Sequence, residues 1–292
     1  MSTEPKTAWP PKQLAAGVVL YHPSAQASGL IETLVEQFDQ IFVVENESRT
    51  FETSDLPIRI ISNKTNRGLA AANNQLCKAA LEDGFDWLVL FDQDSRVPRE
   101  FRSRFAEFFK ALDKPPALLA ANYHTELLGE SFSGYRTPPG QAVTESVVAL
   151  NSGSMIHLRL HRDLGGHDES FFVDHVDHEY CLRLARNGYR VLGTSRPLFR
   201  HEVGNIACAR KFGRVWQSSG HSVDRRREWA CGLVRLARRY WRLKPAWVSV
   251  RLGVELPRNI VAMLLLEGQK TAKLKAVLCG LWRGAFTSES VR

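Results

Sequence analysis

Two aspartates one residue apart follow an apolar stretch, Asp92 and Asp94 in the run LVLFDQDS (88–95). If the strand continued, its alternating side chains would carry both carboxylates on one face, where like charges repel. Hard divalent cations such as Mg²⁺ or Mn²⁺ bind carboxylate oxygens and commonly bring phosphates with them. A metal-diphosphate site would supply the missing positive charge, although a turn after a strand also favours Asp by itself.

A glycine opens a predicted helix in NKTNRGLAAANNQ (63–75). Glycine allows close backbone approach, and free amide groups at a helix start can face an anion. The glycine and lysine spacings match neither a P-loop nor a dinucleotide fingerprint. Plain N-capping is the alternative, and the proximity to the aspartate pair favours a nucleotide contact.

The segment DHVDHEY (174–180) carries acids at helical spacing. In a helix Asp174 and Asp177 would share a face, and Glu179 would lie where it can pair with Arg183. A carboxylate near the metal site could take a proton from an acceptor hydroxyl, with an exposed polar surface as the alternative. His201 follows another short strand and becomes a metal ligand only if the fold returns that strand to the aspartate pair.

The first half of the chain predicts alternating elements: strands at 14–21, 40–45, 58–62 and 87–91, and helices at 28–38, 69–84 and 98–112. This order implies a parallel sheet with helices on both faces, whose ligands bind at the carboxyl ends of the strands. The second half predicts an irregular loop at 123–144, a strand at 147–158, a helix through 173–189, short strands at 191–194 and 198–204, and helices from 205 onward.

The charge is unevenly distributed along the chain. Residues 205–292 carry 18 Lys+Arg and 5 Asp+Glu, a net charge of +13, which leaves −5 for residues 1–204. A basic, Trp-rich segment favours an anionic membrane surface or nucleic acid, with solvated helix faces as the alternative. The acidic strand ends argue against a nucleic-acid-binding protein.

Composition limits the class of protein. A hydrophobic content of 44% fits a folded protein, and the longest apolar run, 260–266, is far shorter than the roughly 18 residues of a membrane span. The N-terminus lacks the pattern of a secretion signal. The five scattered cysteines have no metal-type spacing, so we expect reduced thiols in a cytoplasmic protein.

The order of the motifs YHP, VVENES, NRGLAAANN, FDQDS, NSGS, FFVDHVDHEYCLRLARNGYR and RHEVG resembles the family-2 glycosyltransferases over about residues 14–204. DQDS and FFVDHVDHEYCLRL resemble the rhamnosyltransferase branch. The resemblance implies a GT-A fold: a Rossmann-like, mostly parallel central sheet flanked by helices, here with a basic helical C-terminal extension. The expected domains are an N-terminal tail (1–13), a nucleotide-sugar-binding and catalytic domain (14–204) and the basic region (205–292).

The resemblance also implies roles for single residues. Asp177 would be the catalytic base, with Asp174 as a competitor, and Asp94 and His201 would bind a divalent cation, Mg²⁺ or Mn²⁺. The residues expected to contact the nucleotide-sugar are Tyr21, Pro23, Glu45 (where the family more often has Asp), Asn66, Gly68, Asn74, Asp92 and Gln93.

The expected activity is an inverting transfer of L-rhamnose from dTDP-L-rhamnose to a lipid-linked or lipopolysaccharide-type glycan. The enzyme would work in the cytoplasm, peripherally on the inner face of the cell membrane. A family-2 enzyme using a UDP-hexose is the alternative. A sugar nucleotidyltransferase is more remote, because residues 14–27 lack the Gly-rich phosphate loop that such enzymes carry.

Overall fold

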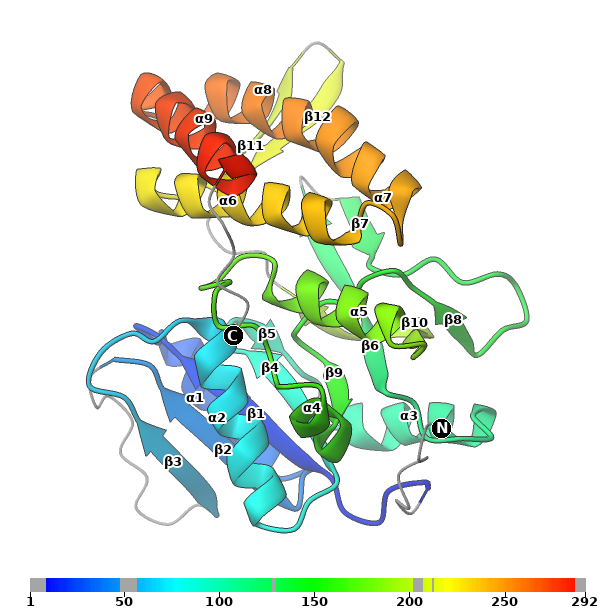
Figure 1. Ribbon diagram of the computed structural model, residues 1–292. Coiled ribbons are helices and arrows are strands. Elements are labelled where there is room, and N and C mark those ends of the chain that lie inside the picture. Colours follow the sequence, from blue (N-terminus) through cyan, green and yellow to red (C-terminus); the bar gives the residue numbers. More distant parts are fainter. Residues whose placement is uncertain (1–8, 48–56, 128–129, 202–206, 212, 287–292) are drawn as a thin grey trace. The chain divides into compact units, whose positions relative to one another are not determined.

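The computed structural model describes residues 9–47, 57–127, 130–201, 207–211 and 213–286 (Figure 1). The chain forms two compact units. The sheet unit comprises residues 1–126 and 131–202, and the C-terminal unit comprises residues 127–130 and 203–292.

The sheet unit is built on one mixed sheet. Its strand order is β3 (Ile58–Ser62), β2 (Gln40–Glu45), β1 (Ala15–Leu20), β4 (Trp87–Asp92), β9 (Ser154–His157), β6 (Leu118–Leu127), β10 (Val191–His201) and β5 (Ser95–Arg96). The first four strands are parallel, as are β6 and β10, whereas β9 runs antiparallel between β4 and β6. Two short strands, β7 (Glu130–Ser133) and β8 (Val143–Glu145), pair with β6 and β10. The predicted α/β fold is confirmed.

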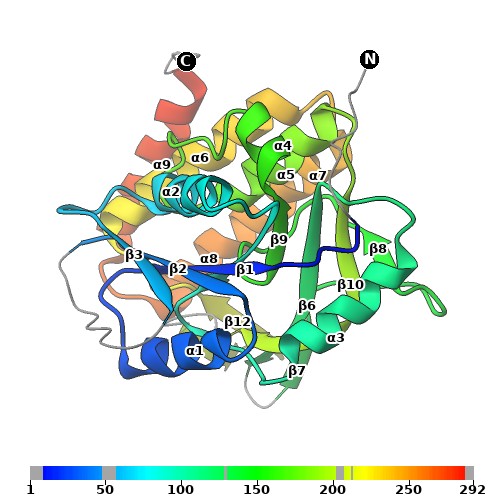
Figure 2. The same cartoon turned by 90° about the horizontal axis from the view of Figure 1, so that it is seen from below.

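Helices cover both faces of this sheet (Figure 2). One layer holds α1 (Ala25–Val35), α3 (Phe101–Glu107) and the 3₁₀ turn η1 (Phe108–Ala111); the other holds α2 (Leu69–Glu82), α4 (Leu158–Asp163) and α5 (Val176–Arg186).

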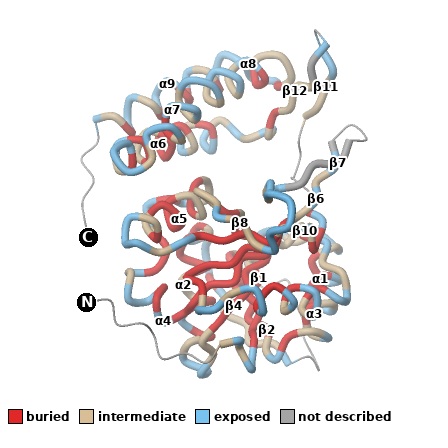
Figure 3. The backbone as a smooth tube through the Cα atoms, turned by 90° about the vertical axis from the view of Figure 1, so that its right-hand side faces the viewer, coloured by how far each residue is buried: buried red, intermediate tan, exposed pale blue. Residues whose placement is uncertain are grey.

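Alternation along β4 decides which layer each of its side chains meets. Val89 and Phe91 pack in the core that contains α1 and α3, whereas Leu88 and Leu90 pack in the core that contains α2 and α5. The central strands of the sheet, β4 among them, form the buried centre of the sheet unit (Figure 3). Because strand side chains alternate, Asp92 continues the row of Leu88 and Leu90 and faces the layer of α2 and α5.

The second half of the sheet unit differs from several predictions. The predicted loop at 123–144 contains the end of β6 together with β7 and β8, and the predicted strand at 147–158 is a strand only at 154–157 before α4 begins. The two predicted strands at 191–194 and 198–204 are one strand, β10, whose described part ends at His201. Its pairing with β6 shifts register around Pro197, so the proline marks an irregularity rather than a break.

The C-terminal unit begins with a hairpin that the sequence analysis missed, β11 (Ala207–Lys211) and β12 (Arg214–Ser218). Helices follow: α6 (Val223–Tyr240), α7 (Pro245–Val250), the π-helical turn η2 (Arg251–Glu255), α8 (Leu256–Leu266) and α9 (Lys270–Phe286). Within the described ranges, none of the helices combines the length and the apolar character that crossing a bilayer requires.

Candidate active site

The aspartate pair lies at the carboxyl end of β4. The strand ends at Asp92, and a turn through Gln93 and Asp94 leads into β5, so the strand does not continue through Asp94. Because β5 pairs with the end of β10, His201 lies opposite Ser95 and the late strand returns to the aspartates. The sequence analysis required this return of the strand before His201 could be considered a metal ligand.

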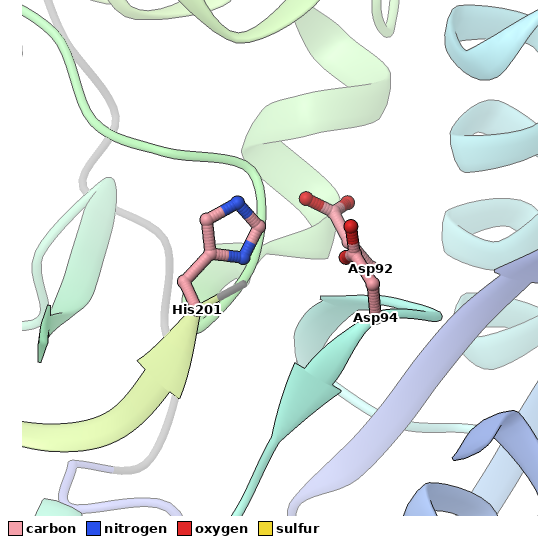
Figure 4. A group of neighbouring side chains, drawn as sticks. All are labelled: Asp92, Asp94 and His201. Atoms are coloured by element: carbon pink, nitrogen blue, oxygen red, sulfur yellow. The ribbon is translucent and has the colours of Figure 1, made fainter. Parts of the chain in front are cut away.

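Three possible ligand groups converge there. Asp92, Asp94 and His201 each offer an atom within 4.8 Å of the others. Figure 4 shows both carboxylates turned toward the imidazole. The Nδ1 atom of His201 is buried and has no hydrogen-bond partner among the described residues. Two carboxylates and an available imidazole nitrogen fit a divalent cation.

The Asp92 carboxyl is held between opposing influences. Burial raises its pKa, a positive charge on His201 and a hydrogen bond from Asn151 lower it, and the negative charge of Asp177 raises it. The net result is a raised pKa. The influence of Asp177 means that this carboxylate lies close enough to act on the same corner of the sheet.

The NSGS motif (151–154) supports this corner, and the sequence analysis gave it no role. Asn151 donates from Nδ2 to Asp92 Oδ1 at 2.8 Å and accepts at Oδ1 from Asn73 Nδ2, also at 2.8 Å. The next residue, Ser152, accepts the Asp92 amide at 3.2 Å and contacts Ser95 Oγ at 2.6 Å. One short segment therefore orients both the carboxylate and the backbone of DQDS. In the sequence this segment is recognisable only as three polar residues, one Asn and two Ser, with one glycine among them.

Asp177 lies in the first turn of α5 and accepts the His178 amide at 2.8 Å. It lines the same small hollow as Asn151, the residue bonded to Asp92. Asp174 lies before the helix, and His175 between them has a left-handed backbone with φ 69°. The prediction that Asp174 and Asp177 share a helical face is therefore wrong, because the helix begins only at Val176.

Another prediction for this helix is confirmed, since the buried Glu179 and the partly buried Arg183 form an ion pair at 3.1 Å. Arg183 also donates to the carbonyl oxygens of Leu164 and Gly166. From α2, Asn74 accepts the His167 amide of the same loop at 2.7 Å. The loop at 164–169 therefore bonds to both α2 and α5. Asn74, which was predicted to contact the nucleotide-sugar, bonds to this loop, and its contact with the donor stays a prediction.

Other residues predicted to contact the donor lie at the ends of neighbouring strands. Gln93 bonds to both backbone groups of Tyr21, accepting its amide at 2.8 Å and donating to its carbonyl at 2.9 Å. Pro23 follows on the same loop and is partly exposed. Glu45, at the end of β2, is buried and accepts the hydroxyl of Ser62 at 2.6 Å.

The start of α2 is occupied by protein contacts. Asn66 accepts the Gly68 amide at 2.8 Å, the Arg67 amide donates to Asn46 at 3.0 Å, and the Leu69 amide donates to the carbonyl of Phe172 at 2.6 Å. These three amides therefore bond to side chains and to the loop before α5, whereas anion binding by the following amides of the helix stays a prediction. Contacts of Asn66 and Gly68 with a nucleotide-sugar stay a prediction.

The chain is similar in sequence to known proteins. Residues 24–128 match the family described as glycosyl transferase family 2. The chain is 26% identical over 271 residues to the dTDP-rhamnosyl transferase RfbF of Shigella flexneri, covering 86% of this chain and 82% of that protein.

Two solved structures share the fold. The mannosyltransferase PcManGT from Pyrobaculum calidifontis, in complex with GDP-Man and Mn²⁺, has a TM-score of 0.53 at 15% identity and covers 97% of this chain and 80% of that one. S. aureus TarS 1-349 in complex with UDP-GlcNAc has a TM-score of 0.53 at 13% identity, with coverages of 94% and 72%.

Proposed function

We propose that this chain, a nucleotide-sugar glycosyltransferase with a GT-A fold, transfers L-rhamnose from dTDP-L-rhamnose. Its similarity to glycosyl transferase family 2 over residues 24–128 and to a dTDP-rhamnosyl transferase over most of its length supports this proposal. The acceptor would be a hydroxyl of a lipid-linked or lipopolysaccharide-type glycan. The name of the Shigella flexneri relative supports the donor. The chemistry is supported most by the convergence of Asp92, Asp94 and His201 in a corner where the charge of Asp177 also acts.

Asp94 and His201 would hold a divalent cation, Mg²⁺ or Mn²⁺, which would neutralise the charge that gathers on the departing diphosphate. Asp92 would meet the sugar or ribose of the donor, in the orientation that Asn151 gives its carboxylate. Gln93 would keep the Tyr21 loop against the end of β4, where the nucleotide would lie. The Mn²⁺ in the PcManGT complex supports the choice of cation.

Asp177 would act as the general base. The acceptor oxygen attacks the anomeric carbon on the face opposite the diphosphate, and its proton passes to the Asp177 carboxylate as the new carbon–oxygen bond forms. The bond from the anomeric carbon to the diphosphate oxygen breaks, and dTDP leaves. One displacement inverts the centre, so a β-linked donor gives an α-glycoside.

The enzyme would work in the cytoplasm, peripherally on the inner face of the cell membrane, where lipid-linked acceptors are found. The net charge of +13 on residues 205–292 supports this location, because anionic headgroups attract basic segments.

A donor panel tests the substrate. We would measure binding and slow hydrolysis of dTDP-rhamnose, UDP-glucose, UDP-galactose and UDP-N-acetylglucosamine with Mn²⁺ present, using water as the acceptor. We expect dTDP-rhamnose to bind tightest and release its nucleotide fastest. Preference for a UDP-sugar would overturn the donor assignment and leave the family assignment intact.

A pair of matched variants tests the base. Asp177→Asn should bind donor as wild type does but lose roughly 10²- to 10⁴-fold in turnover, the usual contribution of a positioned general base. Asp174→Asn, three residues away and outside the helix, is the control and should keep its turnover. The reverse pattern would make Asp174 the base, and full activity in both variants would refute this mechanism.

A further inference from the structure

The outer face of α9 carries three large apolar side chains in a row. Leu278, Trp282 and Phe286 are 56%, 66% and 68% exposed. They are four residues apart in sequence, which places them one above another along the helix. The rings of Trp282 and Phe286 contact each other, with centroids 4.1 Å apart. We call these three residues the α9 row.

Packing on the opposite face keeps this row in water. Gly280 and Gly284 lie against α6 so closely that a Cβ on Gly284 would be 2.6 Å from the carbonyl oxygen of Cys231, and one on Gly280 would overlap that of Arg227. Val277, on the same inner face, is buried in the core of the C-terminal unit. The helix therefore cannot rotate to bury the α9 row without breaking its contacts with α6.

The exposed charge near the α9 row is basic. Helix α9 contains no acidic residue, and its exposed basic residues are Lys270, Lys275 and Arg283, whereas Lys273 is buried and pairs with Glu267 at 2.7 Å. Lys275 is exposed and precedes Leu278 by three residues, so it lies on the same face as the row. Arg283 is exposed as well and pairs with Glu228 at 3.0 Å. A second copy of the chain that packed symmetrically through this face would bring the same positive charge to it, whereas phosphate headgroups bring the opposite charge.

We propose that α9 is the membrane-contacting element of this enzyme and that it lies in the plane of an anionic bilayer surface. The α9 row enters the boundary between headgroups and acyl chains, where Trp and Phe are favoured, and Lys275 and Arg283 lie at the level of the lipid phosphates. This inference rests on the proposed membrane-attached acceptor and names the surface that would bring the enzyme to it.

The test uses the full chain and vesicles of phosphatidylcholine, with or without about a quarter of phosphatidylglycerol. Wild type should cosediment with the anionic vesicles and only weakly with the neutral ones. The variant Leu278→Ser/Trp282→Ser/Phe286→Ser should lose at least about 30-fold in partitioning, since burying one such side chain is alone worth about tenfold or more. Circular dichroism checks that each variant is folded.

The matched control removes apolar surface from another helical face of the same unit. Val250, Val254 and Val261 are 49%, 60% and 41% exposed, and their triple Ser variant should bind vesicles as wild type does. Equal losses in the two variants, or no binding by wild type, would overturn the proposal. So would a concentration-dependent dimer in sedimentation velocity that the α9 variant abolishes.

Donor binding separates this inference from the proposed function. The α9 variant should bind dTDP-rhamnose with Mn²⁺ as wild type does, because the α9 row belongs to the C-terminal unit and the candidate active site to the sheet unit. If wild type binds dTDP-rhamnose but not the vesicles, only the proposed role of α9 is refuted. If wild type does not bind dTDP-rhamnose, the proposed substrate is refuted and the conclusion from vesicle binding is unaffected.

Discussion

Replacing Asn151 should weaken donor and metal binding although this residue is none of the predicted ligands. Its side chain bridges Asn73 on α2 to Asp92 at the end of β4, with two hydrogen bonds of 2.8 Å. Asn151→Ala removes both bonds and leaves the carboxylate and a fully buried amide short of a partner. Asn151→Asp additionally places a second negative charge against Asp92.

The structure sets the size of the effect. A hydrogen bond to a charged group contributes about 1.5–3 kcal/mol. If that energy is lost from the orientation of Asp92, affinity for dTDP with Mn²⁺ falls roughly 10- to 100-fold, at about 1.4 kcal/mol per factor of ten. Asn151→Asp should lose more than Asn151→Ala, because repulsion is added to the missing bond.

Calorimetric titration of dTDP in the presence of Mn²⁺ measures this loss, and steady-state kinetics show whether kcat/KM falls in parallel. Asn122→Ala is the matched control. Asn122 is as buried as Asn73, and its side chain bonds to the backbone of Tyr123, Tyr135 and Ser195. The variant Asn122→Ala should lower the free energy of unfolding without changing the affinity for dTDP and Mn²⁺. Wild-type affinity in Asn151→Ala, or equal losses in Asn151→Ala and Asn122→Ala, would refute the positioning role.

Three further changes probe other parts of the molecule. His201→Ala should raise the Mn²⁺ concentration for half-maximal turnover by roughly tenfold or more, measured as donor hydrolysis across a Mn²⁺ titration, and unchanged Mn²⁺ dependence would remove it from the ligand set. Glu267→Gln should lower the free energy of unfolding by about 3–5 kcal/mol in denaturant titrations, because it leaves two buried cations without their counter-ion. Burial raises the pKa of Glu267, but hydrogen bonds led by that from Lys273 lower it to about 2. The stabilisation is therefore present above the ordinary value of 4.5 and lost as the pH falls toward 2, a dependence that the variant should lack in acid unfolding followed by circular dichroism. Gly280→Ala should lower the melting temperature, because its methyl group would overlap a carbonyl oxygen of α6, whereas Gly29→Ala, with nothing within 4 Å, should not.

The sequence predicted the features that depend on local pattern. Strand and helix periodicities placed β1 to β4 and their helices, and the ends of parallel strands must meet at one edge, so the region of Asp92 and Asp94 followed. Contacts between distant residues were not predictable in this way. Asn151 lies 59 residues from Asp92 and Asn74 lies 93 from His167, and nothing near an asparagine in the sequence says which distant group it will meet.

The local pattern also misled where tertiary contacts compete with it. A glycine at a helix start favours anion binding, but the amides of Arg67, Gly68 and Leu69 bond to other parts of the protein: to Asn46, Asn66 and the Phe172 carbonyl. Helical spacing predicted that Asp174 and Asp177 lie on one helical face. The helix begins only after His175, whose backbone is left-handed, so Asp174 lies outside it. In each case a contact or a backbone angle that the residue types permit, but do not require, decided the structure.

The charges of the site explain why an apolar strand ends on paired acids. Asp92 has a raised pKa because burial and the charge of Asp177 outweigh the help of His201 and Asn151, so the protein alone only partly compensates this negative corner. A divalent cation would favour the ionised form of Asp92, and by linkage the ionised form would favour the cation. A nucleotide diphosphate is negative as well and would be repelled by Asp177 and the aspartate pair. Cation and donor should therefore bind cooperatively, each supplying charge that the other needs, and the acids that repel one another in the protein alone become the reason that the two ligands enter together.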